Sequence, residues 1–152
     1  MSFSDIRIED ILPHRGRMKL VDKIIEIHKD KVVTEAVVNE TWPLIRRKNI
    51  SPLILIELVA QTAGICNGIE RIKKYGLNSE KKGWIVGIKK AVFHVMEIPV
   101  GSRIVTHIEN RFKYDAFREI KGKAIIGSIT ACEVILQVFQ PESENQIQEE
   151  AL

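Results

Sequence analysis

The chain has 152 residues, of which 45% are hydrophobic and 28% are charged. Both fractions are ordinary for a globular protein, so they exclude a disordered or fibrous chain, and the length suits one domain with a single core. The net charge of +3 comes from 23 basic and 20 acidic residues. These are spread along the chain without a long basic block, which argues against a nucleic-acid partner.

The two cysteines, Cys66 and Cys132, fall in a helical and a strand pattern, and no signal-peptide pattern precedes them. We therefore expect buried thiols in a reducing compartment, the cytoplasm. The most apolar stretch, residues 53–66, is shorter than the roughly 20 residues that cross a bilayer. It also carries Glu57 and Gln61, so we expect no membrane span.

The N-terminal elements are predicted from turn-forming residues and from composition. Residues 6–11 indicate a short helix, and residues 12–17 indicate a loop that contains Pro13. Residues 18–27 and 32–38 are rich in Val, Ile and Thr around a polar turn. They predict a β-hairpin.

A long helix is predicted in the middle of the chain. Residues 39–50 show no apolar period and are interpreted as a loop. Ser51 and Pro52 then form a helix-start signal, because Ser caps free N–H groups and Pro fits the first helical position. The helix should end at about Tyr75, with Gly76 as its stop.

The rest of the chain alternates strand-like segments with turns. Strands are predicted at residues 84–94, 102–114, 117–126 and 129–139. We expect one domain over residues 1–140 and a disordered acidic tail over residues 141–152. One apolar helix among about six strands predicts an α+β fold, in which a curved antiparallel sheet wraps the long central helix.

One face of the predicted helix carries a polar and small stripe. Glu57, Gln61, Gly64 and Gly68 follow helical spacing. A buried carboxylate is costly, and burial should raise the pKa of Glu57 so that it donates a proton near neutral pH. Gln61 would orient it, and Gln61 and Gly64 are the candidate substrate contacts on this face. Alternatively, the stripe is a helix-packing seam, with the glycines admitting another helix instead of a ligand and Glu57 hydrogen-bonded to a backbone group.

Several segments, in a consistent order, resemble the stand-alone (3R)-hydroxyacyl-acyl carrier protein dehydratases. The helix segment, residues 57–65, is similar to that family's Glu-Ala-Met-Ala-Gln-Ala-Ala-Gly-Ile, where the Glu is catalytic. The other matching segments are residues 11–15, 18–23, 39–40, 86–93 and 99–102. The resemblance implies a hot-dog fold, a homodimer or higher homo-oligomer, and an acyl tunnel at the subunit interface.

Two departures from the family concern its chemistry. The family's catalytic histidine precedes the helix, yet residues 41–55 contain no histidine. The family's glycine at the helix start, whose N–H polarises the thioester carbonyl, aligns with Pro52, which has no N–H. Leu53 or Ile54 would then have to donate, because a helix N-terminus presents several free N–H groups.

His14 is the candidate replacement base. It lies in a Pro-bounded loop, and such loops often carry chemistry on a rigid scaffold. A structural role is the alternative, since the family has this histidine in addition to its catalytic one. Elimination of water needs a base for the C2 proton and an acid for the hydroxyl, so the pair would be His14 and Glu57.

The expected partner is an acyl carrier protein or coenzyme A carrying the thioester substrate. Arg46, Arg47 and Lys48 in the predicted loop are the candidate contacts, although a solvated charged loop is the simpler interpretation. No spacing suggests a metal site, and we expect no cofactor. The competing functions are an acyl thioesterase and a non-catalytic acyl-thioester-binding protein of the same fold.

Overall fold

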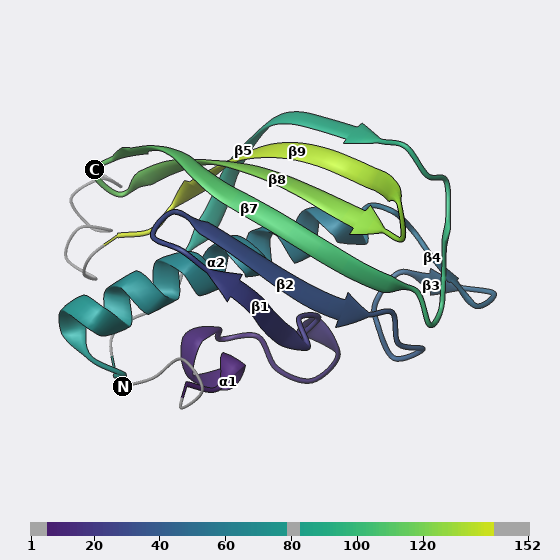
Figure 1. Cartoon of the computed structure of the whole chain (residues 1–152), viewed down its shortest axis with the longest axis horizontal. Helices are drawn as coiled ribbons and strands as arrows, with labels where there is room; N and C mark the ends of the chain where they lie inside the picture. The colour runs from purple at the N-terminus through teal and green to yellow at the C-terminus, as the bar shows by residue number, and fades with distance from the viewer. Residues whose placement is uncertain (1–5, 79–82, 142–152) are drawn as a thin grey trace.

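The computed structural model of the chain describes residues 6–78 and 83–141. Its main feature is a six-stranded antiparallel sheet, ordered β1-β2-β7-β8-β9-β5, that curves over one long helix, α2 (Ile54–Tyr75) (Figure 1). The strands are β1 (Lys23–Ile27), β2 (Lys31–Val37), β5 (Trp84–Phe93), β7 (Arg103–Tyr114), β8 (Phe117–Ile126) and β9 (Ile129–Phe139). This arrangement confirms the predicted α+β class and the strand pattern on which it was based.

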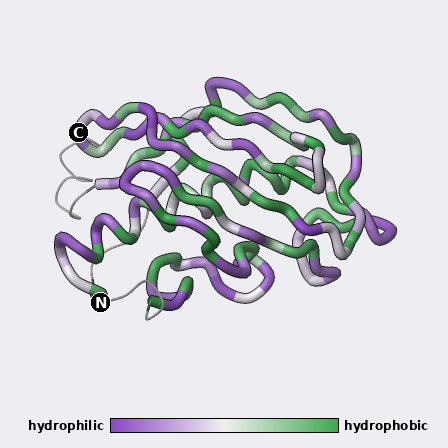
Figure 2. Tube along the Cα trace, viewed as in Figure 1, coloured by the Kyte–Doolittle hydropathy of each residue, from purple (hydrophilic) through white to green (hydrophobic). Residues whose placement is uncertain are grey.

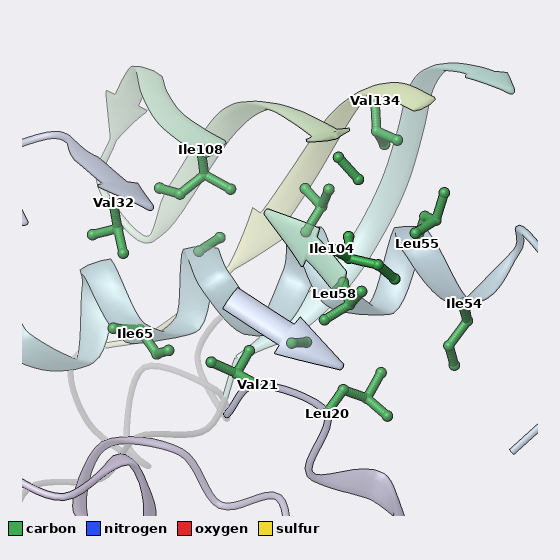
Figure 3. Close-up of a cluster of buried hydrophobic side chains, with 14 of the residues drawn as sticks. Leu20, Val21, Val32, Ile54, Leu55, Leu58, Ile65, Ile104, Ile108 and Val134 are labelled. Atoms are coloured by element: carbon green, nitrogen blue, oxygen red, sulfur yellow. The ribbon is translucent and has the colours of Figure 1, made fainter. Parts of the chain in front are cut away.

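The hydrophobic core fills the space between this sheet and α2. The strands change between hydrophilic and hydrophobic residues along their length, as a sheet with one covered face requires (Figure 2). Figure 3 shows Val32, Ile104 and Val134 of three strands in the same cluster as Leu55 and Leu58 of α2, and all five are fully buried. Each such side chain contributes roughly 1.5–3 kcal/mol by leaving water, so the core fixes α2 against the sheet.

Helix α2 ends where the sequence predicts and begins slightly later. Ser51 Oγ accepts a hydrogen bond from the Leu53 N–H at 3.3 Å, and the regular helix starts at Ile54. At the other end, Gly76 has a φ of 90°, and its N–H donates to the Ile72 carbonyl at 2.8 Å. A left-handed φ is cheap only for glycine, so the stop signal is confirmed.

The segment interpreted as a loop contains a second, small sheet, and that interpretation is therefore wrong. Strands β3 (Ile45–Arg46) and β4 (Asn49–Ile50) form a hairpin, and β4 also pairs with β6 (Ile98–Pro99). The two turn residues, Arg47 and Lys48, both have positive φ, which is the signature of a type I′ turn. That turn favours Asn-Gly, so Arg-Lys gave no sequence signal.

A short helix, α1 (Ile8–Ile11), packs directly on α2 and starts two residues later than predicted. A Cβ added to Gly68 would lie 2.6 Å from Ile11 Cγ2, and one added to Gly64 would lie 2.9 Å from Leu12 Cδ2. Gly68 therefore admits helix α1, and Gly64 admits the residue that follows it, so the packing role proposed for the glycines is confirmed. A 3-10 turn, η2 (Gly16–Met18), follows α1, and the strand predicted from residue 18 begins only at Lys23.

Two further expectations concern the chain as a whole. Among residues 6–78 and 83–141, no helix is both long and apolar enough to cross a membrane. The predicted acidic tail, apart from Pro141, falls outside the described residues.

Candidate active site

The loop after α1 brings His14 against Glu57 in the first turn of α2. The distance between His14 Nε2 and Glu57 Oε1 is 3.1 Å, and the two side chains are 31% and 30% exposed. The histidine and the carboxylate singled out from the sequence are thus hydrogen-bonded neighbours that solvent or a ligand can still reach. Two titratable side chains that a ligand can reach are suited to acid–base chemistry.

The other three histidines, all in the described part of the chain, lie elsewhere. His28 Nε2 is 3.7 Å from Glu26, and His94 Nε2 is 3.3 Å from Glu133. His107 on β7 borders a separate hollow on the sheet. His14 is therefore the histidine that the fold brings to Glu57.

Gln61 ties Glu57 to the loop that follows His14. Its side chain is fully buried, and its Nε2 donates to Glu57 Oε1 at 2.9 Å and to the Met18 carbonyl at 2.7 Å. Its Oε1 accepts from the Leu20 N–H at 3.0 Å. Both ends of the amide are used, so Gln61 holds one oxygen of Glu57 in place, while its predicted contact with substrate remains a prediction.

The environment of Glu57 lowers its pKa. Burial acts to raise the pKa of this carboxyl, but hydrogen bonds from His14 and Gln61 and the charge of His14 act the other way, and the net result lies below the usual 4.5. The expectation that burial raises this pKa and keeps Glu57 protonated is therefore wrong. Sequence reasoning considered desolvation without the two donors that the fold supplies.

A cavity of about 370 Å³ opens beside this pair. It follows α2 from Glu57 to Asn67, a length of about 15 Å at the helical rise. Gly64 lines it, as its place on the stripe predicts. The lining is completed by Leu12, Pro13, His14, Ala60, Ala63, Gly83, Trp84, Ile85, Val138 and Gln140.

Sequence reasoning predicted His14, Glu57 and Gly64 of the lining and missed the others, of which three are polar or aromatic. Asn67 continues the helical spacing from Glu57 and was detectable from it. Trp84 at the start of β5 and Gln140 after β9 carried no such signal, because only sheet pairing brings these two segments beside α2.

The remaining predicted site residues lie outside the cavity lining. The N–H groups of Leu53 and Ile54 already donate to Ser51, at 3.3 Å to its Oγ and 3.2 Å to its carbonyl. The three basic residues Arg46, Arg47 and Lys48 are exposed on the β3–β4 hairpin. Within residues 6–78 and 83–141, no cluster of His, Cys, Asp and Glu could hold a metal ion.

Solved structures of similar shape support the fold. The dehydratase heterocomplex ApeI:P from Xenorhabdus doucetiae matches with a TM-score of 0.84 at 19% identity, covering 97% of this chain and 99% of that one. A mutant HP0420 homologue from Helicobacter felis matches with a TM-score of 0.69 at 12% identity, covering 97% and 96%. These likenesses confirm the predicted hot-dog fold.

Sequence comparisons identify the family. The 3-hydroxyacyl-[acyl-carrier-protein] dehydratase FabZ of Alkaliphilus metalliredigens is 31% identical over 146 residues, which cover 90% of this chain and 92% of that protein. The bifunctional enzyme LpxC/FabZ of Chlorobaculum tepidum is 30% identical over 146 residues, and the match spans 91% of this chain but only 30% of that longer protein. The family profile described as ApeP dehydratase matches residues 6–149. The chain therefore belongs to the ApeP-like dehydratase family, which confirms the predicted hydro-lyase class.

Proposed function

We propose that this protein eliminates water from 3-hydroxyacyl thioesters held on an acyl carrier protein, with His14 and Glu57 as its catalytic residues. The observation that carries the proposal is the 3.1 Å contact between His14 Nε2 and Glu57 Oε1 on the wall of the cavity beside α2. The family places dehydration first among the possible reactions. Synthesis of fatty acids or polyene-type lipids is the setting in which such thioesters arise.

The proposed steps account for each proton. In the resting pair, the Nε2–H of His14 donates to the ionised Glu57, and movement of this proton to Glu57 leaves Nε2 as the base and Glu57 as the acid. His14 Nε2 then takes the C2 proton, and the C2–H electron pair moves onto the thioester as an enolate. As the enolate collapses, the C2–C3 double bond forms, the C3–O bond breaks, and Glu57 gives its proton to the departing hydroxyl, which leaves as water. Both side chains finish in their starting state.

The enolate that develops on the thioester also needs a hydrogen-bond donor. The N–H groups of Leu53 and Ile54 remain our candidates, because they stand at the start of the helix that carries Glu57. Their bonds to Ser51, at 3.3 and 3.2 Å, lie at the long end of the usual range, so a thioester oxygen would exchange for them at small cost.

An acidic carrier protein would dock at the β3–β4 hairpin. Arg46, Arg47 and Lys48 are exposed there, and three neighbouring cations attract an acidic partner and speed encounter. The relative from Alkaliphilus metalliredigens is named for an acyl-carrier-protein substrate. A coenzyme A thioester is the alternative carrier, and comparing the two substrates decides between them.

We further propose that the protein acts as a homodimer or higher homo-oligomer through strand β5. This strand pairs with β9 on one side and forms an edge of the sheet on the other. Its residues Trp84, Ile85, Val86 and Ile88 are between 42% and 54% exposed. Apolar residues exposed on both faces of an edge strand favour pairing with another chain. Since Trp84 and Ile85 also line the cavity, a partner on β5 would help to enclose the substrate.

The cytoplasm is the compartment that we propose for this reaction. Cys66 and Cys132 are both free and buried, and burial raises the pKa of each thiol to about 11. Two unpaired, unreactive thiols suit a reducing compartment.

The test is incubation of the purified protein with a 3-hydroxyacyl thioester of pantetheine and of an acyl carrier protein, followed by mass spectrometry. Loss of one water, abolished in Glu57→Gln and His14→Gln, is the expected result. If a free acid and a free thiol form instead, the protein hydrolyses the thioester and the proposed dehydration is wrong. Unchanged substrate that still binds would make the protein an acyl-binding subunit and would contradict the proposal.

A further inference from the structure

The imidazole of His14 has few contacts of its own to hold it. Its Nε2 meets Glu57, whereas its Nδ1 is buried and has no hydrogen-bond partner among the described residues. Catalytic and metal-binding histidines are usually oriented by a hydrogen bond at the second ring nitrogen. The direction of this ring must therefore be set largely by the backbone that carries it.

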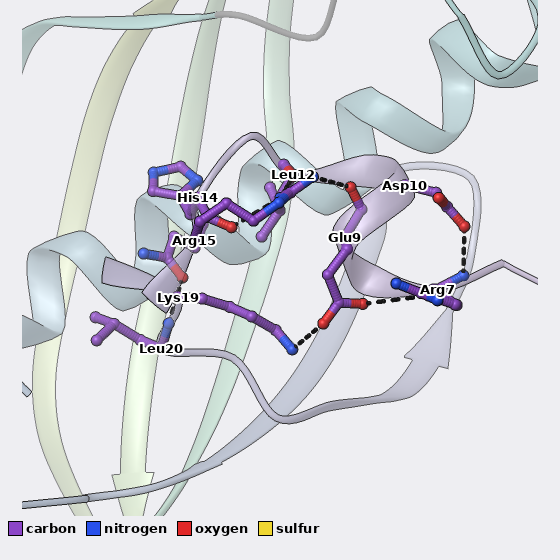
Figure 4. A network of polar contacts seen from close by, with 9 residues as sticks. Arg7, Glu9, Asp10, Leu12, His14, Arg15, Lys19 and Leu20 are labelled. Atoms are coloured by element: carbon purple, nitrogen blue, oxygen red, sulfur yellow. Dashed lines mark hydrogen bonds and ion pairs between the residues drawn. The ribbon is translucent and has the colours of Figure 1, made fainter. Parts of the chain in front are cut away.

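The guanidinium of Arg15 holds that backbone by hydrogen bonds. Arg15 Nη1 donates to the carbonyl of Leu12 at 2.6 Å and to that of His14 at 2.8 Å, so one nitrogen bridges the two residues that flank Pro13. Arg15 Nη2 donates to the Glu9 carbonyl of α1 at 2.8 Å. Figure 4 shows Arg15 extended along this loop toward α1.

The segment that Arg15 binds is itself attached to α2, the helix that carries Glu57. Helix α1 is seated on α2 by the close approach of Ile11 to Gly68. Farther along the chain, the Met18 carbonyl and the Leu20 N–H are bonded to Gln61. The His14 loop is thus attached to α2 on both sides, through α1 before it and through Gln61 after it.

From this geometry we infer that Arg15 is a positioning residue, which holds His14 against Glu57 by binding the carbonyls of Leu12 and His14 in the loop and of Glu9 in α1. The chemistry suits arginine, because a planar guanidinium presents five N–H donors in a fixed fork, whereas the ammonium of lysine is a single point. Arg15 does not line the cavity, and it donates to two residues that do, Leu12 and His14, at their main-chain oxygens. Arg15 would therefore affect catalysis only by fixing the position of the His14 imidazole.

The inference rests on the proposed function, which gives His14 its catalytic role. One part of its test is structural and does not require the protein to turn over a substrate. In Arg15→Met, the crystal structure should show the His14 ring displaced from Glu57 or disordered, while the fold remains. A ring still in contact with Glu57 would overturn the inference, whether or not the chain dehydrates any substrate. Absence of turnover by the unaltered protein would instead overturn the proposed function alone.

The kinetic arm separates positioning from folding. Arg15→Met should lower kcat on the order of 10- to 100-fold with KM close to that of the unaltered protein, since a small misplacement of a catalytic group costs about that much. Arg15→Lys should recover part of the loss. The matched control is Arg17→Met, which removes an exposed cation two residues away and should leave kcat unchanged. Equal kcat in the two Met variants would contradict the positioning role.

Discussion

Gly68 of α2 lies directly beneath Ile11 of α1, so close that a Cβ at position 68 would stand 2.6 Å from Ile11 Cγ2 and 3.1 Å from the Ile11 carbonyl oxygen. The second of these contacts is with backbone and cannot be relieved by a rotamer change. Helix α1 can pack here only because position 68 has no side chain. The position of the His14 loop, which follows α1, depends on the same glycine.

Gly68→Ala should therefore destabilise the protein in spite of the better helix propensity of alanine. Overpacking costs about 1–3 kcal/mol, against a gain of about 1 kcal/mol for alanine over glycine in a helix. The control is Gly64→Ala, where the added methyl meets only the flexible end of Leu12 at 2.9 Å. Urea unfolding of both variants decides the point, and a Gly68→Ala variant as stable as Gly64→Ala would contradict it.

The lowered pKa of Glu57 makes a prediction about stability and pH. Because its pKa in the folded chain lies below the usual 4.5, the ionised carboxylate contributes stability above that pH and loses the contribution as the pH falls through its folded value. The difference in unfolding free energy between the unaltered protein and Glu57→Gln should thus shrink between neutral pH and pH values below 4.5. A constant difference over this range would show that Glu57 is not stabilised as a carboxylate.

The β3–β4 hairpin should be strained, because Arg47 and Lys48 have φ values of 51° and 61°. A left-handed conformation costs a residue with a Cβ about 1–2 kcal/mol. Arg47→Asn combined with Lys48→Gly should then raise the free energy of unfolding while removing two of the cations proposed to receive the carrier. Turnover of carrier-bound substrate should fall, and turnover of the pantetheine thioester should not.

The matched control for that variant is Arg46→Gln. Arg46 is absent from the residues with positive φ, so its replacement removes a charge without relieving strain. It should weaken use of the carrier and leave stability unchanged. If the double variant is less stable than the unaltered protein, the strain argument is wrong. If its turnover of carrier-bound substrate is unaffected, the docking proposal is wrong.

Strand β5 should be the contact between subunits. Val86→Lys places a charge on an apolar edge residue that is 54% exposed and should reduce the mass measured by light scattering to that of a monomer. Ile129→Lys is the control, since Ile129 is equally apolar and 55% exposed but lies at the start of β9. A monomer before any substitution, or dissociation by both variants alike, would exclude β5 as the specific interface.

The sequence by itself predicted the elements whose signals are local. Alternating residues define β8 and β9 to their end residues, Gly76 marks the end of α2, and helical spacing puts Glu57, Gln61 and Gly64 on one face. Each of these depends on contacts within a few residues, for which the period and the turn chemistry are sufficient. The order of the matching segments was likewise enough to predict the dehydratase family.

The tertiary structure alone decided how the site is assembled. His14 and Glu57 meet because α1 is seated on the glycines of α2, and the hydrogen bonds of His14 and Gln61 reverse the direction in which burial would move the pKa of Glu57. The Arg47–Lys48 turn likewise forms against the preference of its residues, where β4 pairs with β6. In each case, contacts between segments distant in sequence outweigh a local tendency, and no local pattern records those contacts.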